Sequence, residues 1–174
     1  MRRRVQVIKD IQKLLLASRI TKPPVKLEPI AKQLNAEIVP RTFPRDLGIS
    51  AILVKEGDRK IIAVNEAHVP TRQRFSVAHE IGHLILHADD AYLTVEKGIE
   101  DTLLFRRLDK TPPDPIEREA NQFAAELLMP EEWIREDFVR LYDKDEENIA
   151  GKLATKYDVS QAALMFRLQS LNLG

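Results

Sequence analysis

Apolar and polar positions follow two different periods along the chain. Over most of its length apolar residues recur every three or four positions, which is typical of helices that bury one face. Between residues 49 and 64 they instead form compact runs rich in isoleucine and valine, which is typical of strands. The pattern predicts helices over residues 5–17, 27–34, 72–86, 116–129, 131–142, 148–157 and 160–171.

Two of the apolar runs predict a β-hairpin. Residues 49–55 and 59–64 are separated by a three-residue loop that contains Gly57, which helps the chain to reverse direction. Strands combined with many helices indicate an α+β fold, in which a small twisted sheet packs against the helix over 72–86. Further short strands are predicted over 36–40, at an edge of the sheet, and over 92–95 and 102–105.

Length and composition narrow the class of protein. The 174 residues suit one domain, which we place at 1–130, with a helical extension over 131–174 packed on it. There is no cysteine, which excludes disulfides, thiolate zinc fingers and cysteine nucleophiles. The 27 basic and 27 acidic side chains balance, which argues against a generally cationic nucleic-acid binder.

The sequence predicts neither a membrane span nor a secretory signal. Lys9 and Asp10 interrupt the apolar run near the start, where a signal peptide needs it continuous. No apolar stretch approaches the roughly 18 residues that a membrane helix requires. We therefore expect a cytoplasmic protein.

The strongest chemical signal is a His-Glu-x-x-His pattern in the helix predicted over 72–86. His79 and His83 are four residues apart and so share one helix face, where both imidazoles can bind a single tetrahedral zinc ion. Glu80 is turned by about 100°, beside the ion, where it can take a proton from a water that the ion activates. The alternative is an amphipathic helix that carries two histidines and a glutamate for other reasons.

Two further residues of this helix carry expectations. Gly82 costs about 1 kcal/mol relative to alanine in a helix. We interpret it as room for another segment to approach closely beside the metal, against the alternative of a merely tolerated glycine. His87 continues the spacing of His79 and His83, but it lies about 12 Å from His79 along the helix, so we leave it out of the metal site.

A third ligand is expected from the helix over 116–129. Glu117 shares a helix stripe with small and apolar residues, which would let two helices approach each other, whereas Glu119 shares a more polar one. We therefore favour Glu117 over Glu119, and we expect Asn121, one turn later, to hydrogen-bond a ligand histidine. The alternative for Glu117 is a first-turn glutamate that the helix dipole favours.

Other assignments stay open. The group that would stabilise an oxyanion has three candidates, His68, Tyr92 and Arg106, each of which could equally be a surface residue. The helices over 148–157 and 160–171 have the spacing of a helix-turn-helix. Phosphate contacts need several basic side chains, and Arg167 is the only one in the second helix, so we favour a packing role there.

Two separated motifs carry a resemblance to a known family. The first reads RxRFSxAHEIGHL over residues 72–84, and the second reads ExxANxFAAxLLMP over residues 117–130. Together they resemble the ImmA/IrrE family of bacterial metallopeptidases. The likeness covers about residues 27–130, after a separate N-terminal helix within 1–18.

The resemblance implies a gluzincin-like site that binds one Zn²⁺ per chain. It implies His79, His83 and Glu117 as metal ligands and Glu80 as the catalytic residue of a zinc endopeptidase. Family members cleave or relieve helix-turn-helix repressors. We expect such a repressor as a separate chain, because the N-terminal DNA-binding domain of some relatives is missing here, and we expect no direct nucleic-acid contact.

Two rival functions follow from the same residues. In the first, the metal site belongs to a binding module that sequesters a transcription factor without turnover. In the second, the chain is one half of a toxin–antitoxin pair. The sequence does not predict an oligomeric state.

Overall fold

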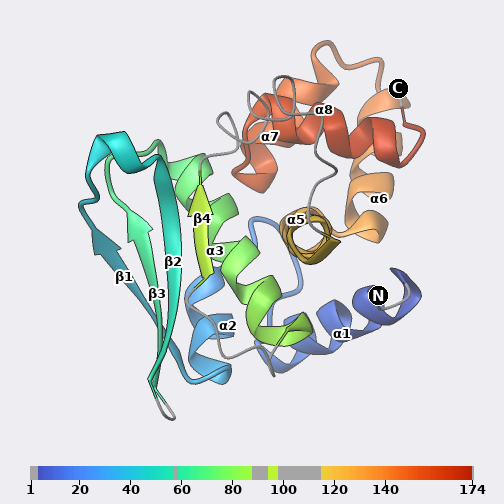
Figure 1. Ribbon diagram of the computed structural model, residues 1–174. Helices are drawn as coiled ribbons and strands as arrows, with labels where there is room; N and C mark the ends of the chain where they lie inside the picture. Colours follow the sequence, from blue (N-terminus) through green and yellow to red (C-terminus); the bar gives the residue numbers. More distant parts are fainter. Residues whose placement is uncertain (1–3, 57–58, 88–93, 98–114, 174) are drawn as a thin grey trace.

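The computed structural model describes residues 4–56, 59–87, 94–97 and 115–173, which form an α+β fold (Figure 1). The helices are α1 (Arg4–Ala17), α2 (Leu27–Gln33), α3 (Pro70–Leu86), α5 (Pro115–Leu128), α6 (Glu131–Tyr142), α7 (Ile149–Tyr157) and α8 (Gln161–Ser170), with a short 3-10 helix η1 (Arg45–Leu47). The strands are β1 (Ala36–Arg41), β2 (Ile49–Glu56), β3 (Arg59–Asn65) and β4 (Thr94–Lys97).

The sheet has the strand order β1-β3-β2-β4. The predicted hairpin is confirmed, because β2 and β3 pair antiparallel with Ala51 opposite Val64 and Leu53 opposite Ile62. These four side chains are buried and point to one face of the sheet, as the two-residue period of a strand requires. The strand predicted over 36–40 is also confirmed at an edge, where it pairs parallel to β3.

The fourth strand overlaps one of the sequence predictions in part. β4 covers Thr94–Lys97 and pairs antiparallel with β2, so that Lys97 lies opposite Ile49. The sequence placed this strand over 92–95. Residues 92–93 and the strand predicted over 102–105 lie outside the described residues.

Helix α3 lies between the sheet and α5 (Figure 1). Its apolar side chains Val77 and Ile81 are buried in the main core, where full burial of such a side chain stabilises by about 1.5–3 kcal/mol. Gly82 faces α5: an added Cβ would lie 3.3 Å from the Cα and carbonyl oxygen of Ala120 and 3.2 Å from Cδ1 of Phe123. The close approach expected of Gly82 is therefore confirmed, and α5 is the segment that approaches.

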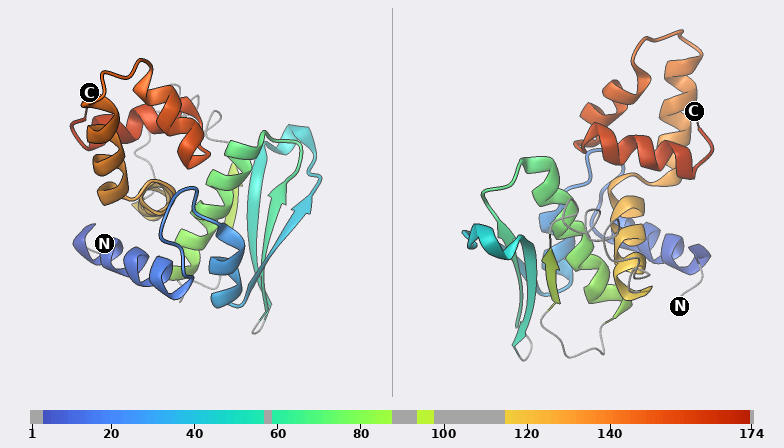
Figure 2. Two further views of the ribbon diagram at one scale, coloured as in Figure 1. Left: turned by 180° about the vertical axis from the view of Figure 1, so that it is seen from behind. Right: turned by 45° about the horizontal axis from the view of Figure 1, so that its top comes forward.

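The C-terminal helices α6, α7 and α8 lie on the far side of α3 from the sheet (Figures 1 and 2). Polar contacts tie them to the core. The Arg74 guanidinium on α3 donates hydrogen bonds to the carbonyl oxygens of Val25 and Asp158, both at 3.0 Å. Arg167 on α8 is buried and donates from Nε to the carbonyl oxygen of Met129 at 3.0 Å. The one basic side chain of α8 is thus used in packing.

None of the helices in the described part of the chain has the length and apolar character of a membrane span.

Candidate metal centre

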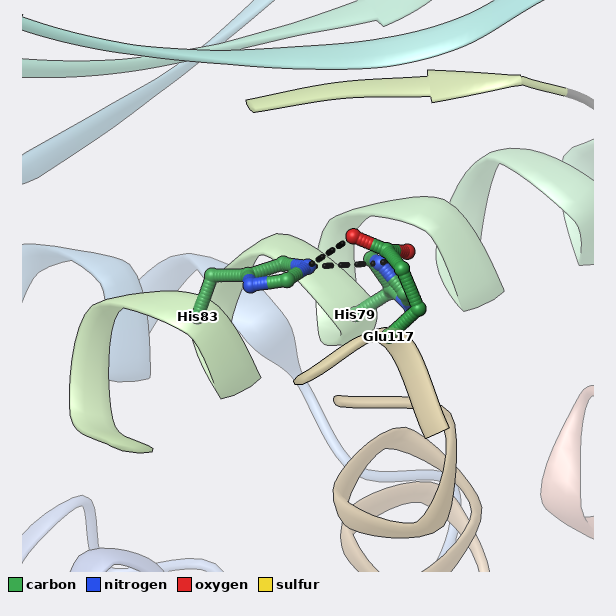
Figure 3. A group of neighbouring side chains, drawn as sticks. All are labelled: His79, His83 and Glu117. Atoms are coloured by element: carbon green, nitrogen blue, oxygen red, sulfur yellow. Dashed lines mark hydrogen bonds and ion pairs between the residues drawn. The ribbon is translucent and has the colours of Figure 1, made fainter. Parts of the chain in front are cut away.

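Helix α3 presents two imidazoles to one point, as the spacing of His79 and His83 predicts. The Nε2 atoms of the two side chains are 2.9 Å apart, and their ring centroids are separated by 4.7 Å (Figure 3). Both residues are buried, with 1% and 2% of their surface exposed. Helix α3 therefore holds them between the sheet and α5, where neither ring is free to turn away.

Helix α5 brings a carboxylate to the same point. The Glu117 oxygens lie 3.2 Å from Nε2 of His79 and 3.3 Å from Nε2 of His83. One ligand atom from each of the three residues lies within 4.8 Å of the others (Figure 3). The alternative, Glu119, is directed to His87 instead, at 3.9 Å from its Nε2. The structure thus gathers His79, His83 and Glu117, and it leaves Glu119 and His87 out of that group.

The surroundings of Glu117 keep its carboxylate ionised. Partial burial opposes ionisation, but the neighbouring rings of His79 and His83, which can donate hydrogen bonds to the carboxylate while no metal is bound, more than offset it, so that the pKa of Glu117 lies well below its usual range. An ionised carboxylate is the form that binds a metal. The Glu117 side chain is 44% exposed, so solvent can reach the three residues beside α5.

The three residues fit a divalent metal of the zinc type. Bonds of 2.0–2.1 Å in a tetrahedron place ligand atoms about 3.4 Å apart. The observed separations of 2.9, 3.2 and 3.3 Å are close to this value. Three protein ligands are also typical of catalytic rather than structural zinc sites, which keep a fourth position for water or substrate.

A hydrogen bond to α5 orients one imidazole. Nδ1 of His79 lies 3.0 Å from Oδ1 of Asn121, one turn after Glu117, which confirms the contact expected of Asn121. Because the amide oxygen accepts, Nδ1 of His79 carries the proton and Nε2 keeps its lone pair for a metal. Nδ1 of His83 is buried and has no hydrogen-bond partner among the residues that the structure describes.

Glu80 directly follows His79 and is fully buried. Its position on α3 turns it by about 100° from His79, beside the group of three. Of the candidates for oxyanion stabilisation, His68 lies 3.4 Å from both Ser50 and Asn65 at the junction of β3 and α3. Tyr92 and Arg106 lie outside the described residues.

Arg72 and Ser50, for which the sequence predicted no role, are joined by a hydrogen bond. One signal was available. Arg72, Ser76, His79 and His83 are spaced at i, i+4, i+7 and i+11, so they share a face of α3.

Comparison with known proteins identifies the family. The IrrE N-terminal-like domain model matches residues 31–169. The chain belongs to the ImmA/IrrE family of metallopeptidases. The match runs past residue 130 and so includes most of the C-terminal helices, which extends the likeness quoted from the two motifs.

Curated relatives agree with this membership of the ImmA/IrrE family. The chain is 36% identical over 111 residues to the radiation response metalloprotease IrrE of Deinococcus radiodurans, and 34% identical over 111 residues to that of Deinococcus deserti. Each match covers 64% of this chain. It covers 31% and 36% of the relatives, so the chain spans about a third of their length.

A solved structure shares the fold. A Mycobacterium tuberculosis transcriptional regulator superposes with a TM-score of 0.59 at 15% identity, over 94% of this chain and 46% of that one. At this identity the likeness supports only the fold of this ImmA/IrrE family member, and not a function.

Proposed function

We propose that the chain is a zinc-dependent endopeptidase that hydrolyses a peptide bond in a protein partner. The observation that carries this proposal is the convergence of His79, His83 and Glu117 on one point, with donor atoms 2.9–3.3 Å apart. Two imidazoles and a carboxylate are a donor set that suits zinc. The buried Glu80 next to this point and membership of a metallopeptidase family support hydrolysis rather than a structural metal.

The residues of the site divide the work of hydrolysis. His79, His83 and Glu117 would hold one zinc ion, with Asn121 fixing the tautomer of His79. A zinc ion supplies Lewis-acid chemistry, which activates water and polarises the peptide carbonyl. Glu80 accepts the proton of the attacking water and delivers it to the leaving amine nitrogen. Because Glu80 is buried, its carboxylate is held in place for both transfers.

The substrate peptide is proposed to bind along β4. Among the described strands β4 lies at the edge of the sheet, next to β2 alone. Figure 3 shows it running alongside α3, across that helix from α5. An extended peptide can add to such an edge through main-chain hydrogen bonds, which would lay its scissile bond at the metal centre.

The proposed partner is a helix-turn-helix transcriptional repressor, supplied as a separate chain in the cytoplasm. The family resemblance supports this choice. The structure of α8 supports a protein substrate rather than DNA, because its one cation, Arg167, is buried against Met129 and Glu126. A cationic surface for phosphates is therefore not formed by this helix.

The test is cleavage of a purified candidate repressor by wild type and by Glu80→Gln. General acid–base catalysis contributes about 10²–10⁴-fold, so we expect the variant to lose at least that much activity while it keeps its zinc. Glu119→Gln, a glutamate of the same helix as Glu117 outside the site, is the matched control and should cleave normally. Equal cleavage by wild type and Glu80→Gln would end the proposal. Relief of repression that survives Glu80→Gln would instead favour sequestration.

A further inference from the structure

Arg72 lies on the same face of α3 as the two histidines. At 100° per residue, Arg72, Ser76, His79 and His83 fall within an arc of about 60°. At a rise of 1.5 Å per residue, Arg72 lies about 10 Å from His79 toward the N-terminal end of the helix. Residues of an extended peptide are spaced by about 3.3 Å. Arg72 is therefore level with a substrate residue about three positions from the scissile bond.

The positive charge of Arg72 is not neutralised within the described part of the protein. Its Nη2 donates to Oγ of Ser50 at 3.2 Å, and its buried Nε has no hydrogen-bond partner among the described residues. No carboxylate of those residues pairs with it, whereas Arg74 pairs with Asp158 and Arg167 pairs with Glu126. The N–H groups of Nη1 and the second N–H of Nη2 remain to donate to a carboxylate, which a guanidinium binds well.

The structure holds Arg72 in place before any ligand arrives. Ser50, its hydrogen-bond partner, is buried at the start of β2. Asn65 fixes this part of β2 against the end of β3, since its Nδ2 donates to the carbonyl oxygen of Ile49 at 2.8 Å and its Oδ1 accepts from the backbone of Ala67 at 3.0 Å. A guanidinium fixed in this way loses little freedom on binding, which favours selectivity.

The edge strand leads from the metal centre toward Arg72. Lys97, the last residue of β4, pairs with Ile49, which precedes Ser50. In Figure 3 the arrow of β4 points along α3 in the direction from His83 to His79, toward the N-terminal end of the helix. Ser76 lies between Arg72 and the histidines on this face, and its buried hydroxyl has no partner within the described residues. A peptide added along β4 would therefore pass the metal centre and then Arg72.

We propose that Arg72 is a specificity residue, which binds an acidic side chain of the substrate about three positions from the scissile bond. The inference rests on the proposed function and names a feature of its substrate. It predicts the preference on one side of the scissile bond alone, because α3 carries Arg72 on one side of the histidines.

The test is a cleavage profile on a synthetic peptide mixture in which every residue type is equally represented at each position. With the zinc-loaded wild type we expect Asp or Glu to exceed Asn or Gln by about tenfold, as for a hydrogen bond to a charged group, at one position about two to four residues from the cut. Arg72→Gln should reduce this ratio to about one, and Arg72→Glu should shift it toward Lys and Arg.

Two more variants separate recognition from folding. Arg59→Gln changes an exposed arginine of β3 that pairs with Glu37, and it should leave the profile unchanged. Ser50→Ala keeps the charge of Arg72 and removes its anchor, so the acid preference should weaken and spread over neighbouring positions. Zinc content and thermal unfolding show which variants are folded. If Arg72→Gln is not folded, the Ser50→Ala profile tests the inference instead: a weaker acid preference supports it, and an unchanged preference overturns it.

A binding arm separates the failure of this inference from that of the proposed function. Zinc-loaded Glu80→Gln is panned against the same mixture, and bound peptides are sequenced. If wild type cleaves without an acid preference, or if Arg72→Gln keeps that preference, the inference about Arg72 is overturned and the peptidase assignment stands. If wild type does not cleave, but the bound peptides show an acid preference that Arg72→Gln removes, the peptidase assignment is overturned and the inference about Arg72 stands. If wild type does not cleave and the bound peptides show no acid preference, both the peptidase and the inference are overturned.

Discussion

The two ends of α5 each carry a glutamate, and the two carboxylates meet opposite kinds of partner. At the N-terminal end, the Glu117 carboxylate meets the Nε2 atoms of His79 and His83. Each of these atoms can offer a lone pair to the same point. At the C-terminal end, Glu126 is buried and pairs with Arg167 of α8, and it also accepts from the backbone of Glu131 at 3.0 Å. The second arrangement is complete within the protein, whereas the first could hold a metal ion from outside. The same residue types thus hold the fold at one end and form a candidate reaction site at the other.

The largest effect is expected at the C-terminal end of α5, where Glu126 pairs with Arg167. Arg167→Ala leaves Glu126 buried without its partner, and loss of one member of a buried pair costs about 3–5 kcal/mol. Unfolding in urea should show this loss in the free energy of unfolding, while the zinc affinity stays unchanged. Arg59→Ala, which breaks an exposed pair with Glu37, should cost less than about 1 kcal/mol. A cost below about 1 kcal/mol for Arg167→Ala would show that this contact does not hold the fold.

A smaller effect is expected at the N-terminal end of α5, near the group of His79, His83 and Glu117. Asn121→Ala removes the oxygen that accepts the Nδ1 proton of His79, and such partners contribute about 10–100-fold to metal affinity. Competition with a chelator should show the weaker zinc binding. Asn121→Asp keeps an acceptor in place and should retain the affinity. If Asn121→Ala binds zinc as tightly as wild type, the orientation of His79 does not depend on this contact.

The smallest effect concerns a second complete cluster, in the C-terminal helices. Tyr157 is buried and donates from its hydroxyl to Oδ2 of Asp137 at 2.8 Å. Burial and this carboxylate raise the pKa of the Tyr157 hydroxyl well above its ordinary value. The unfolded chain therefore loses this proton first, so the stability that Tyr157 contributes is present below about pH 10 and falls above it by about 1.4 kcal/mol per pH unit.

Urea unfolding from pH 8 to pH 11 tests this sign. The difference in free energy of unfolding between wild type and Tyr157→Phe should shrink as the pH rises past about 10. Tyr142→Phe, at an exposed tyrosine of α6, should differ from wild type by a constant amount. A constant difference for Tyr157→Phe as well would contradict the account.

Local patterns predicted much of the fold and of the candidate site. Helical spacing identified the helices, and the Gly57 loop identified the hairpin. The His79 and His83 pair followed from the four-residue spacing. The phase of α5 favoured Glu117 over Glu119, because the small neighbours of Glu117, such as Ala120, allow α3 to approach.

Contacts between distant segments were not predictable in the same way. The parallel pairing of β1 with β3 and the strand order depend on registers that no local period encodes. The contact of Arg167 with Glu126 joins residues 41 positions apart. The link between Ser50 and Arg72 depends on where β2 meets the start of α3, although the spacing of Arg72 from the histidines was visible.

The central claim is that the N-terminal end of α5 completes a metal site on α3, and zinc analysis tests it most directly. Wild type and Glu119→Gln, purified and dialysed in parallel against trace zinc, should each carry about one zinc per chain, the stoichiometry of a three-ligand site. Glu117→Gln and His83→Ala should lose most of it while their thermal unfolding stays cooperative. Retention of a full zinc ion by Glu117→Gln, or loss of zinc from Glu119→Gln alone, would contradict the account.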